Sequence, residues 1–120
     1  MNQKMAFELM IMRFIDAYVD LHNEINTTTI INQFPIHRTK ASKIIQLYLK
    51  DKPSNLRYVL SKSRYLKGFS FEKLYLKDES SLTYLNAMEL AFLPYTEFLK
   101  EEAAKLAAQE AKEADKAKAK

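Results

Sequence analysis

The residues of this 120-residue chain that favour a particular chemistry are basic side chains gathered between positions 37 and 77. That segment holds eight Lys and three Arg against two acidic residues, a net charge of +9, whereas residues 1–36 sum to −2 and residues 78–120 to −3. The overall charge of +4 therefore hides a strongly basic middle third. A cationic block of this kind attracts polyanions through Coulomb forces and the release of counterions. We expect a polyanionic partner, the alternative being a merely well-solvated, Lys-rich surface.

Composition excludes most other kinds of site. The absence of Cys removes disulfides, thiolate metal ligands and Cys nucleophiles. His22 and His37 do not have ligand-like spacing, so no metal site is expected. Gly68 is the single glycine, which excludes glycine-rich phosphate loops. Neighbouring carboxylates such as Asp16 and Asp20 fall on helix faces with no cleft implied, and nothing resembles a catalytic triad. We therefore expect no enzyme activity, no metal and no cofactor.

The length and hydrophobicity of the chain fit one compact domain. Hydrophobic residues make up 48% of the sequence and aromatic residues 12%, enough to form a core. Charged residues, among them Lys4, Arg13 and Asp16, interrupt the N-terminal apolar pattern well short of a signal peptide or a membrane span. We therefore expect a cytoplasmic protein that does not enter the membrane.

Apolar periodicity predicts three helices in the first 50 residues. Residues 3–22 carry apolar side chains three and four positions apart, which predicts an amphipathic helix that stops at Asn23. Residues 24–26 are short enough to be a single extended rung beside a later hairpin. A second, short helix begins near Thr27 or Thr28, whose hydroxyl caps free N–H groups, and ends before Pro35. A third helix covers residues 38–50, and this order is typical of a helix-turn-helix.

The outer face of the third helix carries the residues expected to contact DNA. A helix fits the major groove of B-DNA, and side chains in its first turns reach base edges. Arg and Lys are the natural readers of guanine, Gln pairs with adenine, and short hydroxyl side chains reach phosphates or a thymine methyl group. On this basis we expect guanine contacts from Arg38 and Lys40, phosphate or methyl contacts from Thr39 and Ser42, a phosphate contact from Lys43, and an adenine contact from Gln46.

A hairpin directly after this helix is expected to act as a wing. Two β-favouring runs, 56–59 and 64–66, flank a polar tip. Lys62, Ser63 and Arg64 at the tip are expected on the DNA backbone or in an adjacent minor groove. The aromatic residues of this region, such as Tyr58, are at alternating strand positions and are expected in the core. Residues 69–76 form either a further extended segment or a loop packed on the core.

The last third of the chain is expected to be helical. Asp78-Glu79-Ser80 predicts a helix start, because acidic residues are favoured at the positive end of a helix, and Pro94 should kink or divide the helix that follows. Residues 101–120 are rich in Ala, Glu and Lys and predict a frayed, solvated tail. The expected division is a DNA-binding domain at 1–78, a dimerisation segment at 79–100 and the tail at 101–120. We expect dimerisation through the first helix, residues 3–22, and through a seam of apolar residues in a/d spacing, which are Leu85, Met88, Phe92, Tyr95 and Leu99.

Several short motifs, taken as an ordered set, resemble a known family. They are Gln33-Phe34-Pro35-Ile36, Lys40-Ala41-Ser42, Leu47-Tyr48-Leu49, Pro53-Ser54-Asn55-Leu56-Arg57-Tyr58 and Ser63-Arg64-Tyr65. The stretch from Ile30 to Phe71 resembles the winged helix-turn-helix module at the start of WYL-domain transcriptional regulators, notably repressors of bacterial phage-defence islands. The resemblance implies homodimers that bind specific operators. It also implies that Arg38, Thr39, Lys40, Ser42 and Lys43 lie on the recognition helix, and Lys62 and Arg64 on the wing.

The sequence thus predicts a mainly α fold with a small β-hairpin, a winged helix-turn-helix with a C-terminal helical extension. We expect a sequence-specific regulator of transcription, a repressor, that binds double-stranded DNA as a homodimer on an inverted-repeat operator. The family usually continues into a WYL ligand-sensing domain, whereas this chain continues as a helical segment, which favours a stand-alone regulator. The alternative is a protein-interaction adaptor that uses the winged-helix scaffold, with residues 80–120 as its docking arm.

Overall fold

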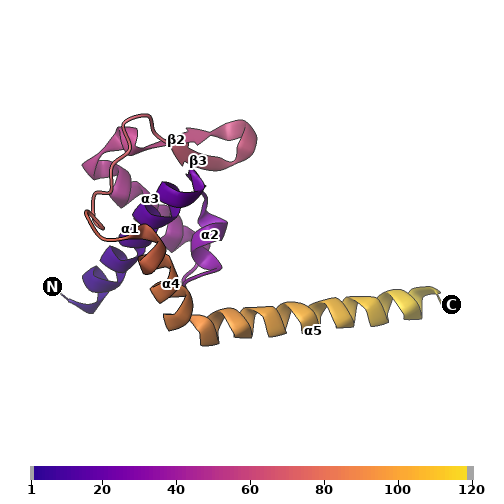
Figure 1. Cartoon of the computed structure of the whole chain (residues 1–120). Helices are drawn as coiled ribbons and strands as arrows, with labels where there is room; N and C mark the ends of the chain where they lie inside the picture. Colours follow the sequence, from indigo (N-terminus) through magenta and orange to yellow (C-terminus); the bar gives the residue numbers. More distant parts are fainter. Residues whose placement is uncertain (1, 119–120) are drawn as a thin grey trace.

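The computed structural model describes residues 2–118. In chain order the elements are α1 (Gln3–His22), β1 (Glu24–Ile25), α2 (Thr27–Ile31), α3 (Arg38–Asp51), the 3₁₀ turn η1 (Pro53–Asn55), β2 (Leu56–Val59), the 3₁₀ turn η2 (Leu60–Lys62), β3 (Arg64–Lys67), α4 (Ser81–Ala91) and α5 (Leu93–Lys118) (Figure 1). The ends of the predicted N-terminal domain and of the predicted tail, residue 1 and residues 119–120, lie outside the described residues.

Asparagine side chains and backbone set the limits of the first two helices. Asn23 ends α1 in the left-handed region, at φ 66°, and its N–H donates to the Val19 carbonyl, as the sequence predicted. The predicted cap of α2 at Thr27 or Thr28 is wrong. Asn26 is the N-cap, and its Oδ1 accepts a hydrogen bond of 2.8 Å from the Thr29 N–H. Asn and Thr both cap helices well, so the residue pattern did not distinguish these neighbouring positions.

The corner between α2 and α3 anchors the hydrophobic core. Phe34 is completely buried, and its ring meets those of Phe14 and Phe92 edge-on at centroid distances of 5.1 and 4.9 Å. Edge-to-face geometry is favourable because the positive ring edge meets the negative ring face. Phe14 comes from α1 and Phe92 follows α4, so this one side chain joins three parts of the chain.

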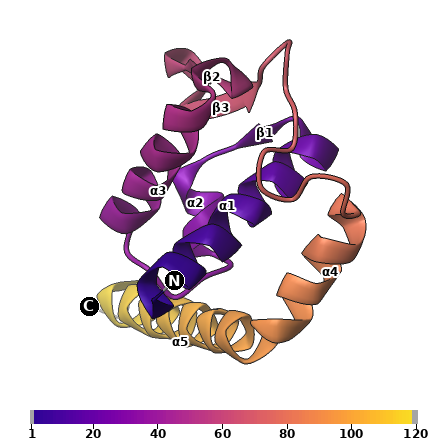
Figure 2. The same cartoon turned by 90° about the vertical axis from the view of Figure 1, so that its left-hand side faces the viewer.

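A three-stranded antiparallel sheet in the order β1-β3-β2 completes the body. Ile25 of β1 pairs with Tyr65 of β3, and Tyr58 of β2 pairs with Tyr65 from the other side. The predicted extended rung beside the hairpin is therefore confirmed. Figure 2 shows the sheet at the end of α1 and α3, with a loop that passes from β3 to α4. That loop contains residues 69–76, which form no strand with the sheet.

The C-terminal third contains two helices, of which one packs on the body and the other projects from it. The chain divides at Phe92, next to Pro94, as predicted from the missing N–H of proline. α4 packs on α1, where the Tyr84 hydroxyl donates to the Met10 carbonyl at 2.7 Å. α5 projects from the body as a single long helix (Figure 1), and its side chains from Glu101 to Ala114 are exposed. The predicted helical tail is thus confirmed as a helix up to Lys118.

Candidate nucleic-acid interface

The polar face of α3 is presented to solvent as the sequence predicted. Its apolar stripe, Ala41, Ile44, Ile45 and Tyr48, is completely buried. Consequently the opposite stripe is exposed, because residues three and four apart share a helix face. The exposed side chains that were predicted to contact DNA are Arg38, Thr39, Ser42, Lys43 and Gln46, and Lys50 is exposed with them.

Arg38 connects the beginning of α3 to α2. Its guanidinium donates hydrogen bonds to the hydroxyl oxygens of Thr27 at 2.7 Å and Thr28 at 3.3 Å. A guanidinium carries five N–H groups in a fixed plane, so further donors remain for a phosphate or a base. Arg38 therefore links the beginning of α3 to the first turn of α2.

Lys40 lies on the flank of α3 and not on its exposed face. Its Nζ pairs with the Glu8 Oε1 of α1 at 2.6 Å, and the two side chains are 33% and 14% exposed. A half-buried charge pair is costly to separate, because each charge must then be solvated or paired again. We therefore do not retain Lys40 as a reader of guanine, the role that its sequence position suggested.

The two cations predicted at the wing tip, Lys62 and Arg64, lie in different environments. The tip of the hairpin is η2, which ends at Ser63 in the left-handed region at φ 51°. Lys62 and Ser63 are exposed there, in the position that the sequence predicted. Arg64 instead pairs with Glu24 of β1 at 2.6 Å, and this carboxylate raises the pKa of the Arg64 guanidinium. Of these two cations, Lys62 is therefore the more available to a phosphate.

A contact between α3 and the wing makes their exposed faces continuous. The Gln46 Nε2 donates to the Tyr65 hydroxyl of β3 at 3.3 Å. The Tyr65 ring packs on that of Tyr58 at a centroid distance of 4.8 Å, and Tyr58 is 51% exposed. The expectation that Tyr58 belongs to the core is thus wrong. The strand register places Tyr58 and Tyr65 opposite each other, which a single sequence does not reveal.

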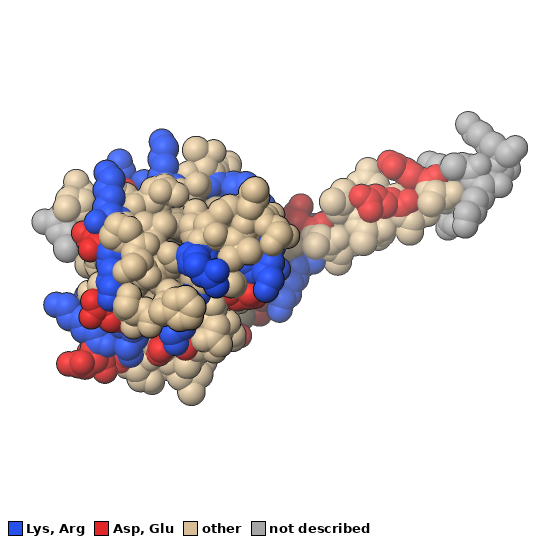
Figure 3. Space-filling model, turned by 90° about the horizontal axis from the view of Figure 1, so that it is seen from above, with Lys and Arg blue, Asp and Glu red and all other residues tan. Residues whose placement is uncertain are grey.

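Four cations of the basic middle third are neutralised within the chain. Besides Lys40 and Arg64, Lys52 pairs with Glu72 at 3.0 Å and Lys67 with Asp20 at 3.8 Å. Among the described residues, Lys43, Lys50 and Lys62 form no ion pair within 4.0 Å. Figure 3 shows Lys and Arg side chains at several places on the body, and acidic side chains along the projecting α5. The free charge is therefore smaller than the sequence total. It includes Lys43 and Lys50 on α3 and Lys62 at the wing tip, and also Arg57 on β2 and Lys73 and Lys77 in the loop after the wing.

The predicted dimer seam is used largely within the chain. Leu85, Met88 and Phe92 are half-buried and pack on the core, and the Tyr95 hydroxyl donates to the Ile31 carbonyl at 3.2 Å. Leu99 is also half-buried. The a/d spacing of these residues thus describes, in the main, how α4 and the first turns of α5 cover α1 and α2. The large apolar side chains left exposed on these helices are Leu82, Leu90, Leu93, Phe98 and Leu106.

This arrangement defines a class of protein. Three helices around a buried corner, followed by a hairpin that lies beside the exposed face of the third helix, form a winged helix-turn-helix domain. Residues 9–90 match a family model described as the BrxR transcriptional regulator winged helix-turn-helix domain. The chain belongs to this family, and the match includes α4 as well as the wing. No curated protein matches the sequence. Within residues 2–118, no helix has the length and hydropathy needed to cross a membrane.

Proposed function

We propose that this protein is a sequence-specific regulator of transcription, a repressor, that binds an inverted-repeat operator as a homodimer. The observation that carries the proposal is the hydrogen bond from Gln46 of α3 to Tyr65 of the wing. It makes the exposed face of a basic helix and a hairpin tip parts of one surface. A duplex can then meet the helix in its major groove and the hairpin on the adjacent backbone. Membership of a family of DNA-binding regulators supports the same function.

We assign the contacts by exposure and by side-chain chemistry. We assign base contacts to Gln46 and Arg38, and phosphate contacts to Lys43 and Lys62. Thr39, Ser42 and Ser63 complete the surface with exposed hydroxyls. Tyr58, beside Tyr65, adds a half-exposed phenol between the helix and the wing tip.

The homodimer is proposed because one domain presents one recognition helix, which reads few base pairs alone. We place the interface on α5 and the DNA-binding body at α1 to α4. Leu106 follows Leu99 by seven residues and so continues the same helix face beyond the body, where it is 58% exposed. Phe98, one residue before Leu99, is 54% exposed. Two copies of α5 packed together would cover these side chains, which are more than half exposed in the described chain.

Sedimentation of the full chain tests the dimer. We expect a dimer for the wild type and a monomer for the double variant Phe98→Ser, Leu106→Ser, because it removes the exposed apolar surface of α5. Lys105→Ser is the matched control on the same helix and should remain dimeric. A wild-type monomer at tens of micromolar protein would refute the dimer.

Selection from random DNA duplexes tests the function itself. We expect enrichment of two inverted half-sites whose centres lie about 10 base pairs, one helical turn, apart or a multiple of it. Gln46→Ala should relax the preference at one position of each half-site at a cost of about 1–3 kcal/mol. Lys105→Ala, on α5, should leave the selected sequence unchanged. Recovery of no common sequence would exclude a specific regulator and favour a protein-interaction adaptor.

A further inference from the structure

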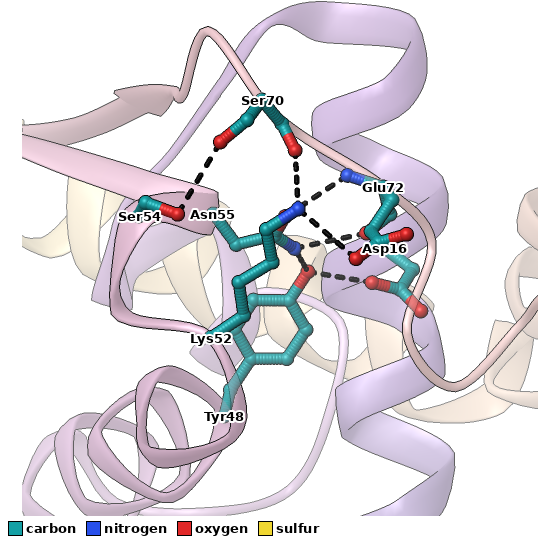
Figure 4. Close-up of polar contacts among 7 residues, drawn as sticks. All are labelled: Asp16, Tyr48, Lys52, Ser54, Asn55, Ser70 and Glu72. Carbon is teal, nitrogen blue, oxygen red and sulfur yellow. Dashed lines mark hydrogen bonds and ion pairs between the residues drawn. The ribbon is translucent and has the colours of Figure 1, made fainter.

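A buried polar network lies where the wing leaves the body. Asn55, the last residue of η1, is completely buried directly before β2. Its Nδ2 donates to the Tyr48 hydroxyl at 2.6 Å and to the Glu72 carbonyl at 3.0 Å, and its Oδ1 accepts from the Glu72 N–H at 2.9 Å. One amide side chain thus binds α3 on one side and the loop after the wing on the other (Figure 4).

The network continues to α1 through a second buried group. The Tyr48 hydroxyl donates to the Asp16 Oδ1 at 2.5 Å, and the Asp16 Oδ2 accepts from the N–H groups of Tyr75 at 2.6 Å and Leu76 at 2.9 Å. Burial raises the pKa of Asp16 and also that of Tyr48. Among the described residues, no buried side-chain nitrogen or oxygen lacks a hydrogen-bond partner. A fully satisfied buried network holds its members in one arrangement, because any other leaves polar groups unpaired.

Both ends of the wing meet this network. β2 begins directly after Asn55, and at the end of β3 the Gly68 N–H donates to the Asn55 carbonyl at 3.0 Å. A Cβ on Gly68 would lie 2.0 Å from the Ser54 carbonyl oxygen, so the two strand ends approach as closely as a glycine allows. Lys52 adds a tether from the end of α3, since its Nζ donates to the Ser70 carbonyl and to Glu72 (Figure 4).

We propose that Asn55 is a positioning residue for DNA binding, which holds the wing at the angle to α3 that one duplex requires. The inference rests on the proposed function. Asn55 is buried and touches no DNA, so it acts through Tyr48 of α3 and through the strands that it anchors. Removing its amide frees the base of the wing from α3, and the wing tip then no longer binds the phosphate that lies beside the major groove occupied by α3.

The experiment is a double-mutant cycle between Asn55 and Lys62, scored by the salt dependence of binding to one duplex. Lys62→Ala should reduce the slope of log affinity against log salt by about 1 in the wild-type background, because one phosphate contact is lost. In the Asn55→Ala background, Lys62→Ala should leave the slope nearly unchanged. Lys43→Ala should reduce the slope by about 1 in both backgrounds, because Lys43 lies on α3 and not on the wing.

Two further variants test whether the effect depends on the Asn55 network. Asn86→Ala, an exposed asparagine on α4, should leave the effect of Lys62→Ala unchanged. Tyr48→Phe removes the Asn55–Tyr48 hydrogen bond and the Tyr48–Asp16 hydrogen bond, while Asn55 keeps Glu72. It should weaken the Lys62 effect as well, and it keeps the proposal testable where Asn55→Ala does not fold. A Lys62 effect of the same size in wild type and in the Asn55 or Tyr48 variant would overturn the positioning proposal and leave the proposed function standing. A wild type that binds no duplex would overturn both.

Discussion

Gly68→Ala tests the close approach at the base of the wing. The added Cβ would lie 2.0 Å from the Ser54 carbonyl oxygen and 3.0 Å from that of Asn55, and both are backbone atoms that no side-chain rotation moves aside. Relief requires the strand to move by more than an ångström, at a cost of about 1–3 kcal/mol for overpacking. The move also weakens the hydrogen bond from Gly68 to Asn55, worth about 1 kcal/mol. The smaller conformational freedom of Ala in the unfolded chain returns about 0.4–1 kcal/mol. We therefore expect the free energy of unfolding to fall by about 2 kcal/mol.

Thermal unfolding followed by circular dichroism measures this loss. A fall of about 2 kcal/mol lowers the Tm by about 8 °C in a domain of this size. Phe69→Ala is the neighbouring control, because the Phe69 side chain is fully exposed, and it should change the free energy of unfolding by less than about 0.5 kcal/mol. A Tm for Gly68→Ala within about 2 °C of the wild type would refute the close approach of the two strand ends.

Three further predictions follow from the core and the ion pairs. Phe34→Ala should lower the free energy of unfolding, measured by urea titration, by about 3–5 kcal/mol, because the substitution leaves a cavity among the aromatic rings that Phe34 contacts. A loss below about 1 kcal/mol would show that the corner does not anchor the core. Asp16→Asn should remove a pH dependence. Burial raises the pKa of Asp16 in the folded state above its ordinary value of 3.8, so the folded state keeps this proton to a higher pH than the unfolded state does. The free energy of unfolding of the wild type therefore falls as pH rises from about 4 through the raised pKa, and then levels off. Equal slopes for the two proteins in urea titrations over this range would contradict the raised pKa. Lys40→Ala should change the salt slope of DNA binding, measured by fluorescence anisotropy, by less than half of the change caused by Lys43→Ala, because Lys40 is paired with Glu8. Equal changes for the two variants would show that Lys40 belongs to the DNA interface.

Local patterns were enough to predict most of the fold. The three-four spacing of apolar residues predicted α1 and α3. Pro35 predicted that α2 ends before it, and Pro94 predicted the division between the C-terminal helices. Each of these signals acts through neighbouring residues: periodicity selects a face, and a proline removes a backbone donor. The cap of α2 was misplaced by one or two residues, because several residues that cap well stand together at Asn26–Thr28.

Contacts between distant residues decided the rest of the site. The pairs Lys40–Glu8 and Arg64–Glu24 join positions 32 and 40 residues apart, and they withdraw two cations that local reasoning assigned to DNA. The role of Asn55 also depends on partners from other elements, Tyr48 and Glu72. In the same way, the a/d spacing at Leu85 and Met88 predicts a packed face but does not tell whether the partner is another chain or the same one. A single sequence shows which side chains a helix face carries, but the tertiary fold decides which of them remain unpaired and exposed to a partner.

We propose that the exposed face of α3 and the wing tip bind one duplex at the same time. The most direct measurement is the salt slope of binding to the selected duplex for Lys43→Ala, Lys62→Ala and the double variant. We expect each single change to reduce the slope by about 1 and the double change to reduce it by about 2, because the two phosphate contacts are separate and simultaneous. A double variant with the slope of either single variant, or with that of the wild type, would contradict it.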